Sequence, residues 1–457
     1  MVLTNTVKIY LILFHVLLGL MAFYFPELFR VYYILFFCYA VYQIARKETE
    51  AVKVGHIYIA YWVGFEMLIR LSGAIFIDQF GKYGVLLLIF ISFFTTKQFS
   101  HLKPPIFIGF IILLMVSMAL MGSDTIAREF DLVSFYRSGP ICLAFCVFYF
   151  NGLQLEFKKD FITMLFASIL PIISIIVIIF IKAGGIDISS LAYGANSAQS
   201  GGFGPNQVSV ILGYGMMVLF VGFLFRTSIT GSFILDGVLL LILVYRILVT
   251  FSRGGFISPL IALVLGVLYL SIKSKSFIKE NQTALLAFLI GGGLVFLAWE
   301  QTNNLTGNKL EERYEGYTGD TKYTDRREFS SGRDKLALVE LEIFQDNIIM
   351  GVGPGMATKA RAEKFRGGKE ELVANHTEFS RMLAEHGLFG LMALLILLGY
   401  PLVMLRQSKS SSNSFILILL VVLSLLTQAH NAHRLALPSF LYGLAFVNLV
   451  KDRNKNT

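Results

Sequence analysis

The chain has 457 residues, of which 56% are hydrophobic and 15% are charged, whereas soluble domains carry about one-quarter charged residues. Apolar runs of about 18 or more residues recur along the chain, and runs of this length predict transmembrane helices. Runs such as PIISIIVIIFI do not alternate, which excludes a membrane β-barrel. The net charge of +9 does not indicate a nucleic-acid partner, because Lys and Arg are expected in cytoplasmic loops.

About fourteen segments have the composition of membrane spans, at roughly 20 residues per crossing. They lie at 7–25, 28–44, 56–77, 83–99, 105–121, 139–151, 161–182, 206–225, 232–250, 256–271, 283–299, 388–406, 414–428 and 436–450. The sequence therefore predicts an all-α polytopic membrane protein with about 12–14 transmembrane helices and one long, partly helical loop. We expect helices with short loops over 1–299, the long loop over 300–387, and C-terminal helices with a tail over 388–457.

The distribution of basic residues predicts the orientation. With a cytoplasmic N-terminus, the inner loops hold groups of cations, whereas the short outer loops hold single ones. The inner cations include Arg46, Lys47, Lys53, Lys97, Lys103, Lys158, Lys159, Arg226, Lys273, Lys275, Lys279, Arg406 and Lys409. The positive-inside rule then places both termini in the cytoplasm and the long loop in the periplasm. Topology does not explain the isolated outer cations.

Two features lie within predicted spans. Glu66 and Arg70 are four residues apart, so they share a helix face and are predicted to pair. Arg246 stands about two turns before Arg253. Ionic groups within a membrane are candidates for function, but a buried pair of this kind also serves architecture.

Two motifs stand at the outer ends of spans. In GGFGPNQVS, residues 201–209, Pro205 and Asn206 resemble the first residues of a helix. In FSRGGFIS, residues 251–258, Arg253 is followed by Gly254 and Gly255. Glycines let a backbone approach a ligand closely, and arginine recognises phosphate with a fixed fork of donors. An interfacial arginine beside a helix break is the structural alternative.

The long loop has two parts of different character. Residues 303–330 are polar and mixed in charge, which predicts poor packing. SGRDKLALVELEIFQDN then has apolar residues at helical spacing, with Arg333 near the helix start. GVGPG predicts a turn, and a second helix is expected from about Thr377. On spacing alone, the favoured interpretation of Arg333 is an ordinary solvated charge.

The histidines are candidates for proton transfer. In NHTEFSRMLAEHGLFG, residues 375–390, His376 falls at the predicted helix start, and Glu385 and His386 lie farther along. Histidine is suited to proton transfer near neutral pH. A surface or helix-capping role is the alternative for His376. The segment HNAHRLALP, residues 430–438, adds two more histidines and Arg434 outside, without an interpretable spacing.

The sequence lacks the motifs of several other kinds of site, namely disulfides, metal sites and ATP-binding loops. The three cysteines, Cys38, Cys142 and Cys146, all lie in apolar runs and predict neither a disulfide between outer loops nor a zinc site. The outer loops lack an Asp-x-Asp pair that would suit a divalent cation on a diphosphate. A GxxxxGK[ST] loop is also missing. We therefore predict no metal, no cofactor and no ATP-driven transport.

The outer motifs occur in a characteristic order. SRGG follows a span, then come SGR and GVGPG, then NHTEFSRMLAEHGLFG. This set, with the preceding GPN, resembles the O-antigen ligase and O-antigen polymerase superfamily over roughly residues 190–405. The resemblance implies a metal-independent membrane glycosyltransferase whose donor is a glycan on undecaprenyl diphosphate. This sequence has His-Thr where many members have His-Asn or His-Ser.

The resemblance also implies roles for residues. His376 matches the histidine proposed to activate the acceptor hydroxyl, and Arg253 and Arg333 match the arginines that hold the diphosphate. Residues expected to support the site are Gly254, Gly255, Asn206, Glu385 and Arg434. The implied location is the bacterial inner membrane, with the active site on the periplasmic side.

Several acceptors and partners remain open. Our leading hypothesis is a polymerase of O-antigen or exopolysaccharide repeat units, whose acceptor is a glycan. The alternatives are a ligase that transfers glycan to the lipid A core, or a protein oligosaccharyltransferase. A transporter or flippase for a lipid-linked glycan is a further alternative, which would favour charges at the membrane midplane and symmetric broken helices. The implied partners include the lipid bilayer, a flippase and a chain-length regulator, and no nucleic acid.

Overall fold

The structure is a computed structural model that describes residues 3–47, 51–77, 79–96, 103–119, 130–185, 187, 194–273, 282–316, 332–364, 377–431 and 433–450. Its helices in the first half of the chain are α1 (Asn5–Tyr24), α2 (Pro26–Ala45), α3 (Ala51–Ser72), α4 (Phe80–Thr96), α5 (Ile106–Ala119), α7 (Phe130–Phe150), α8 (Ile162–Ala183), α9 (Pro205–Leu224) and α10 (Phe233–Val249). A π-helical turn, Phe157–Phe161, precedes α8, and a 3₁₀ turn, Ala198–Ser200, precedes α9.

The second half continues in the same manner. Its helices are α11 (Arg253–Lys273), α13 (Gln282–Leu305), α14 (Lys309–Tyr314), α15 (Arg333–Asp346), α16 (Ala357–Lys364), α17 (Glu378–Gln407), α18 (Ser411–Asn431) and α19 (Leu437–Leu444). Two short strands, β1 (Gln154–Glu156) and β2 (Asn448–Val450), pair in parallel. Seven helices within the described residues are long and apolar enough to cross a membrane, and α4 and α5 are shorter apolar helices. The chain is thus an all-α polytopic membrane protein.

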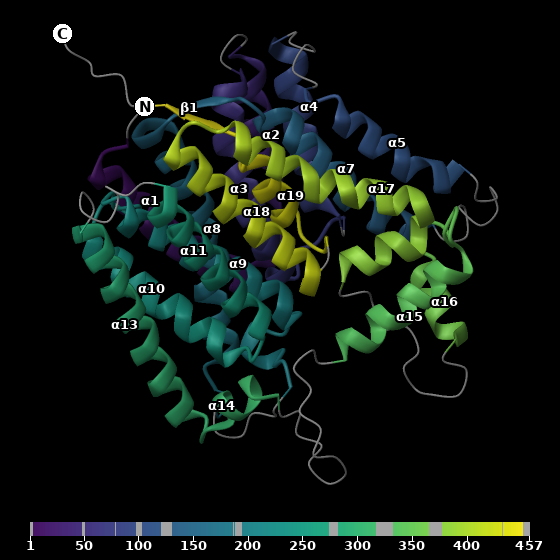
Figure 1. The fold of residues 1–457 in the computed structure, drawn as a ribbon. Coiled ribbons are helices and arrows are strands. Elements are labelled where there is room, and N and C mark those ends of the chain that lie inside the picture. Colours follow the sequence, from purple (N-terminus) through teal and green to yellow (C-terminus); the bar gives the residue numbers. More distant parts are fainter. Residues whose placement is uncertain are drawn as a thin grey trace.

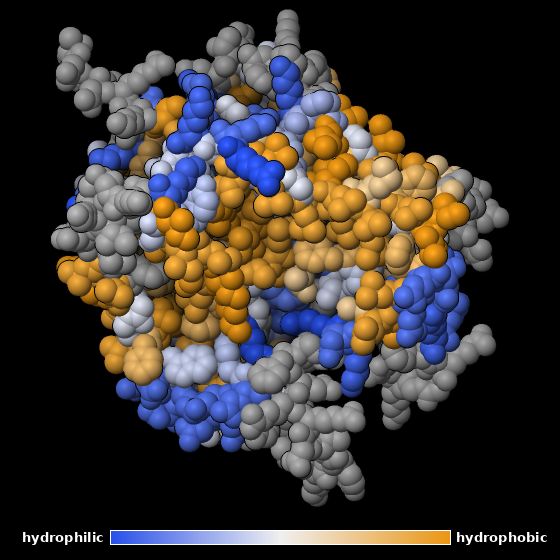
Figure 2. Space-filling view, viewed as in Figure 1, coloured by the Kyte–Doolittle hydropathy of each residue, from blue (hydrophilic) through white to orange (hydrophobic). Residues whose placement is uncertain are grey.

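The helices form an apolar belt between two hydrophilic ends. Figure 1 shows β1 and the described start of the chain at one end, and α14, α15 and α16 at the opposite end. Figure 2 shows an orange band of hydrophobic side chains between these ends. Large apolar side chains of these helices, such as Ile261, Leu289 and Leu395, are exposed, as expected for surfaces that face lipid.

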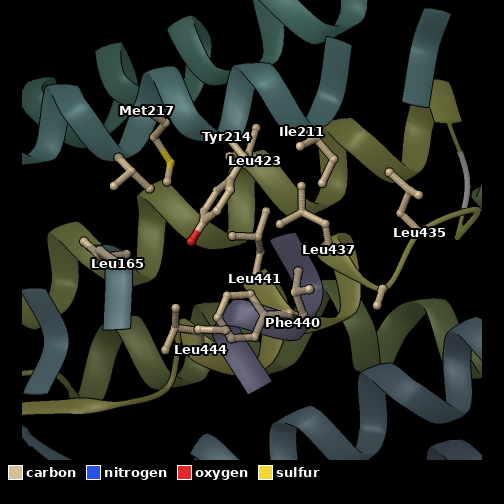
Figure 3. Close-up of a cluster of buried hydrophobic side chains, with 14 of the residues drawn as sticks. Leu165, Ile211, Tyr214, Met217, Leu423, Leu435, Leu437, Phe440, Leu441 and Leu444 are labelled. Carbon is tan, nitrogen blue, oxygen red and sulfur yellow. The ribbon is translucent and has the colours of Figure 1, made fainter. Parts of the chain in front are cut away.

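The apolar core runs through the bundle, and one part of it lies where α8, α9, α18 and α19 meet. Figure 3 shows Leu165 of α8, Tyr214 of α9, Leu423 of α18 and Phe440 of α19 pointing toward one another. All four side chains are buried. The Tyr214 hydroxyl lies 2.8 Å from the Ser168 hydroxyl, so its polar group is satisfied within this apolar core.

Each of the fourteen predicted spans overlaps a helix, but two predictions of extent were wrong. The segment predicted at 139–151 belongs to α7, which begins at Phe130. The segment predicted at 436–450 is helical only over Leu437–Leu444 and ends in β2. Non-helical backbone is tolerated at membrane depth where protein surrounds it, and the segment from α19 to Val447 is buried throughout.

Candidate functional site

Three arginines converge on one pocket at the hydrophilic end that carries α14 and α15. Its volume is about 200 Å³, and it is lined by Arg253, Arg313 and Arg333 together with Ala195, Asn206, Phe251 and Ser252. We call it the arginine pocket. Figure 2 shows hydrophilic side chains in a hollow beside the apolar belt, between the regions where Figure 1 labels α14 and α15. The three arginines come from three separate segments of the chain.

The SRGG motif places Arg253 at the first residue of α11. Phe251, two residues before it, has a left-handed backbone, with φ of 53°, which turns the chain sharply between α10 and α11. The two glycines permit close packing. A Cβ on Gly255 would overlap Ser209 of α9, and a Cβ on Gly254 would lie 2.7 Å from the Nε2 atom of His430. The glycines therefore seat the start of α11 between α9 and α18.

The GPN motif forms the neighbouring wall. Pro205 is the first residue of α9, a position where its missing N–H is not needed. Asn206 then accepts a hydrogen bond through Oδ1 from the Ser252 hydroxyl at 2.8 Å. Ser252 in turn accepts one from the Ser209 hydroxyl at 2.8 Å. This chain fixes the residue before Arg253 to the start of α9.

Arg313 was missed by the sequence analysis, and the prediction of poor packing was wrong for residues 303–316. Helix α13 runs on to Leu305, and α14 follows with Leu310 fully buried. The backbone carbonyl of Arg313 accepts a hydrogen bond from Arg253 Nη1 at 3.2 Å. Burial, with the charges of Arg253 and Arg333, lowers the pKa of Arg313 to about 10. Residues 317–331 lie outside the described residues.

Arg333 is the first residue of α15, and the predicted loop helix is confirmed. Gly332 before it has a left-handed φ of 79°. Burial, followed by the charges of Arg253 and Arg434, lowers the pKa of Arg333 to about 10. Arg434 is therefore close enough to add its charge to the group. All four arginines keep their protons at neutral pH, so they hold like charges together in a partly buried site.

The GVGPG turn braces α17 against the rest of the loop. Helix α17 is kinked at Gly387, where φ is 58° and ψ is −135°, and the kink releases carbonyls from the helical hydrogen-bond pattern. The amide of Val352 donates to Ala384 O, and the amide of Gly353 donates to Glu385 O, both at 2.9 Å. The predicted turn and the predicted second helix thus form one unit.

Glu340 ties α15 to the first residues of α17. It accepts hydrogen bonds through Oε2 from the Ser380 hydroxyl at 2.5 Å and the Thr377 hydroxyl at 3.2 Å, and Arg361 Nε lies 3.5 Å from its Oε1 atom. Burial raises the pKa of Glu340. His376, the predicted catalytic residue, lies outside the described residues. Its neighbour Thr377 is the N-cap residue of α17, but its hydroxyl bonds to Glu340 and makes no capping bond to the helix backbone.

Glu385 does not line the arginine pocket. It belongs to a buried group on α17, which we call the α17 ion cluster, where Arg381 pairs with both Glu378 and Glu385. The Arg381 guanidinium also lies 4.8 Å from the centre of the Tyr136 ring. His433 Nδ1 lies 3.0 Å from Glu378 Oε1. Glu385 thus contributes to the packing of α17, and its supporting role in the site stays a prediction.

The charged residues in and beside the predicted spans make contacts that stabilise the fold. The predicted Glu66–Arg70 pair is confirmed, with 3.1 Å between Oε1 and Nη2, and Glu66 Oε2 accepts the Ala436 amide at 2.7 Å. Lys82 donates to the His433 carbonyl at 2.8 Å. Arg246 donates to the Gln199 carbonyl at 2.6 Å. Within the described residues, no group of three or more His, Cys, Asp or Glu side chains is arranged to hold a metal ion.

Comparison with known families agrees with the motifs. Residues 238–395 match the family model described as O-antigen ligase. The matched segment contains all three arginines that line the pocket, and it ends within α17. A search of curated proteins found no match. The family match confirms the resemblance to the O-antigen ligase and O-antigen polymerase superfamily.

Proposed function

We propose that this member of the O-antigen ligase superfamily transfers a glycan from undecaprenyl diphosphate, and that the arginine pocket holds the diphosphate. The observation that carries the proposal is the convergence of Arg253, Arg313 and Arg333 on one pocket of about 200 Å³. Guanidinium groups bind phosphate oxygens with two parallel hydrogen bonds. Gathering like charges is unfavourable in itself, so an anionic ligand is the simplest reason for the arrangement.

The reaction needs two kinds of assistance. The bond between the anomeric carbon and the diphosphate oxygen breaks, and the electron pair stays with the diphosphate. Fixed arginine charges in a partly dry site stabilise that negative charge and make a metal ion unnecessary in this proposal. The acceptor hydroxyl oxygen bonds to the anomeric carbon as its proton passes to a base. We assign His376 as that base, because histidine is suited to proton transfer near neutral pH and because it matches the histidine that the family resemblance implies for this role.

The pocket has a boundary suited to a lipid-linked donor. Next to Arg253 and Arg313, the rings of Phe256, Trp299 and Tyr314 pack together, with 4.7 Å between the Trp299 and Tyr314 ring centres. Aromatic side chains of this kind gather where membrane meets water. The polyprenyl chain would then stay in the bilayer while the diphosphate reaches the arginines.

The proposed setting is the bacterial inner membrane, with both termini in the cytoplasm and the arginine pocket on the periplasmic side. The asymmetry of basic residues supports this orientation. Cysteines introduced at Glu315 and Ser410 should react with a membrane-impermeant reagent from opposite sides. Labelling of both from outside would contradict the topology.

The acceptor is the less constrained half of the reaction. We favour a growing glycan as acceptor, which makes the protein a polymerase of O-antigen or exopolysaccharide repeat units. Transfer to the lipid A core is the second candidate, because the matching family is described as O-antigen ligase.

A reconstituted assay tests both the donor and the acceptor. Purified protein in lipid nanodiscs receives the undecaprenyl-diphosphate-linked repeat unit, and the products are separated by size. A polymerase should release undecaprenyl diphosphate and form a ladder of longer lipid-linked glycans. A ligase should release it only after lipid A-core is added. No release under either condition would refute the proposed function.

A further inference from the structure

The junction between α18 and α19 contains several buried polar atoms without hydrogen-bond partners. We define the α18–α19 junction as His430, Asn431, His433 and Arg434. Asn431 is fully buried, yet neither its Oδ1 nor its Nδ2 atom has a partner among the described residues. The same holds for Nε2 of His430 and Nε2 of His433. Buried polar atoms are nearly always satisfied by protein, water or ligand, so four such atoms in three residues require an explanation.

The junction touches both halves of the proposed reaction centre. On one side, the His430 ring packs against Gly254, the residue after Arg253. On the other side, His433 Nδ1 lies 3.0 Å from Glu378, which is two residues after His376. Arg434 lies close enough to Arg333 for its positive charge to contribute to the lowered pKa of Arg333. The junction therefore lies between the arginine pocket and the start of the helix that follows His376.

The junction is held firmly by its neighbours. Lys82 donates to the His433 carbonyl at 2.8 Å, and Glu66 accepts the Ala436 amide at 2.7 Å. His430 Nδ1 lies 2.7 Å from the backbone carbonyl oxygen of Leu426. The unsatisfied atoms thus belong to a segment that several hydrogen bonds hold in place, and fixed placement is what a binding site requires.

We propose that the α18–α19 junction binds the sugar hydroxyls of the acceptor, with Asn431 as its central residue. This inference rests on the proposed function and names the acceptor half of the site. A hydroxyl group both donates and accepts hydrogen bonds. Asn431 offers one acceptor and two donor hydrogens, and the histidine Nε2 atoms take either role according to tautomer. A phosphate needs donors only, so the mixed set fits an uncharged sugar better than a second anion.

Two probes separate the acceptor half of the site from the donor half. The first is the oligosaccharide repeat unit released from its lipid by mild acid, which lacks the diphosphate. The second is undecaprenyl diphosphate without glycan. Each probe is titrated into the full-length protein in nanodiscs, and its affinity is measured. Asn431→Leu keeps the side-chain size but removes its hydrogen bonds, and should weaken oligosaccharide binding by about tenfold, the effect of one or two hydrogen bonds.

The same variant should leave the affinity for undecaprenyl diphosphate within about twofold, since Asn431 does not line the arginine pocket. Gln428→Met is the matched control. Gln428 is also a buried amide on α18, one turn before Asn431; its Nε2 atom is bonded to the Ser424 hydroxyl at 3.0 Å, and only its Oε1 atom is without a partner among the described residues. This variant should change neither affinity. Asn431→Ala serves as a second variant if Asn431→Leu does not fold.

Three results would overturn the inference. Unchanged oligosaccharide binding in the Asn431 variants would mean that water alone satisfies these atoms. Equal weakening of both probes would mean that Asn431 only supports the fold, as would an equal effect of Gln428→Met. Failure of the proposed function itself looks different, because undecaprenyl diphosphate would then bind equally well to the wild type and to Arg253→Ala.

Discussion

Two regions of this protein bury arginine, and they do so in opposite ways. In the α17 ion cluster, Arg381 lies between Glu378 and Glu385, so its charge is neutralised by direct pairs. In the arginine pocket, Arg253, Arg313 and Arg333 line one cavity, and burial together with their mutual repulsion lowers the pKa values of Arg313 and Arg333. The first arrangement holds a fold together, whereas the second opposes folding and is expected where an anion is bound.

The contrast extends to the histidines of the last loop helix. His386 is buried at the α17 kink, with Nδ1 2.5 Å from the Ser117 hydroxyl. His376 belongs to the segment before α17, next to the anchored Thr377. We therefore expect one histidine to serve packing and the other to serve chemistry.

The largest expected effect is on His376. A general base typically contributes about 100- to 10,000-fold to the rate, so His376→Ala should nearly abolish transfer while leaving membrane insertion and folding intact. His386→Ala at matched protein level is the comparison, and should retain most activity per folded molecule. The rate of undecaprenyl diphosphate release measures both. The reverse pattern would show that the wrong histidine was chosen.

The second-largest effect on the transfer rate is expected from substitutions in the arginine pocket. Arg253→Ala and Arg333→Ala should each lower transfer by about 100- to 1,000-fold, since each removes fixed charge from the leaving group. Arg253→Lys should also be poorly tolerated, because ammonium keeps the charge but loses the bidentate geometry. Arg313→Ala tests whether the arginine that the sequence analysis missed acts with them. Full activity in both Arg253→Ala and Arg333→Ala would remove the basis for this site.

For the free energy of unfolding, we expect substitutions in the α17 ion cluster to have a larger effect than substitutions in the arginine pocket. Arg381→Met leaves two buried carboxylates without their partner, and breaking a buried pair in this way costs about 3–5 kcal/mol. Arg253→Met removes repulsion from the arginine pocket and should leave the free energy of unfolding nearly unchanged or slightly raised. Thermal unfolding in one detergent compares the two. A lower melting temperature for Arg253→Met than for Arg381→Met would contradict the view that the α17 ion cluster stabilises the fold while the arginine pocket does not.

The sequence predicted what depends on local pattern. Apolar runs located helices that overlap each of the fourteen predicted segments, helical spacing predicted α15, and GVGPG predicted the turn that contacts α17. The end of the chain was harder, because α19 is a short buried helix whose composition matches a full span. Its boundaries depend on contacts with Ser424 of the preceding helix and with Glu66, and Glu66 lies 370 residues away in the sequence.

The site was only partly predictable for the same reason. Arg253 and Arg333 were found through motifs, and the structure brings both to one pocket. Arg313 lies in a short polar helix anchored by a single buried leucine, Leu310, and such a segment has too little periodicity to be distinguished from a mobile loop. The contact between His433 and Glu378 joins residues 55 positions apart in separate helices, and spacing carries no information about it.

The smallest expected effect concerns pH, and it separates the proposed base from the arginines. The pKa values of Arg313 and Arg333 are lowered to about 10, so both guanidinium groups stay charged at neutral pH and lose protons only as pH rises through about 10. Binding of the glycan-linked donor should therefore change by less than about twofold between pH 6 and pH 8 and weaken above about pH 10. Transfer should instead rise between pH 6 and pH 8, because an ordinary histidine loses its proton near pH 6.5. Measuring donor affinity and turnover on the same preparation tests this separation. Donor binding that falls steeply from pH 6 to pH 8 would mean that a group other than these arginines dominates recognition of the diphosphate.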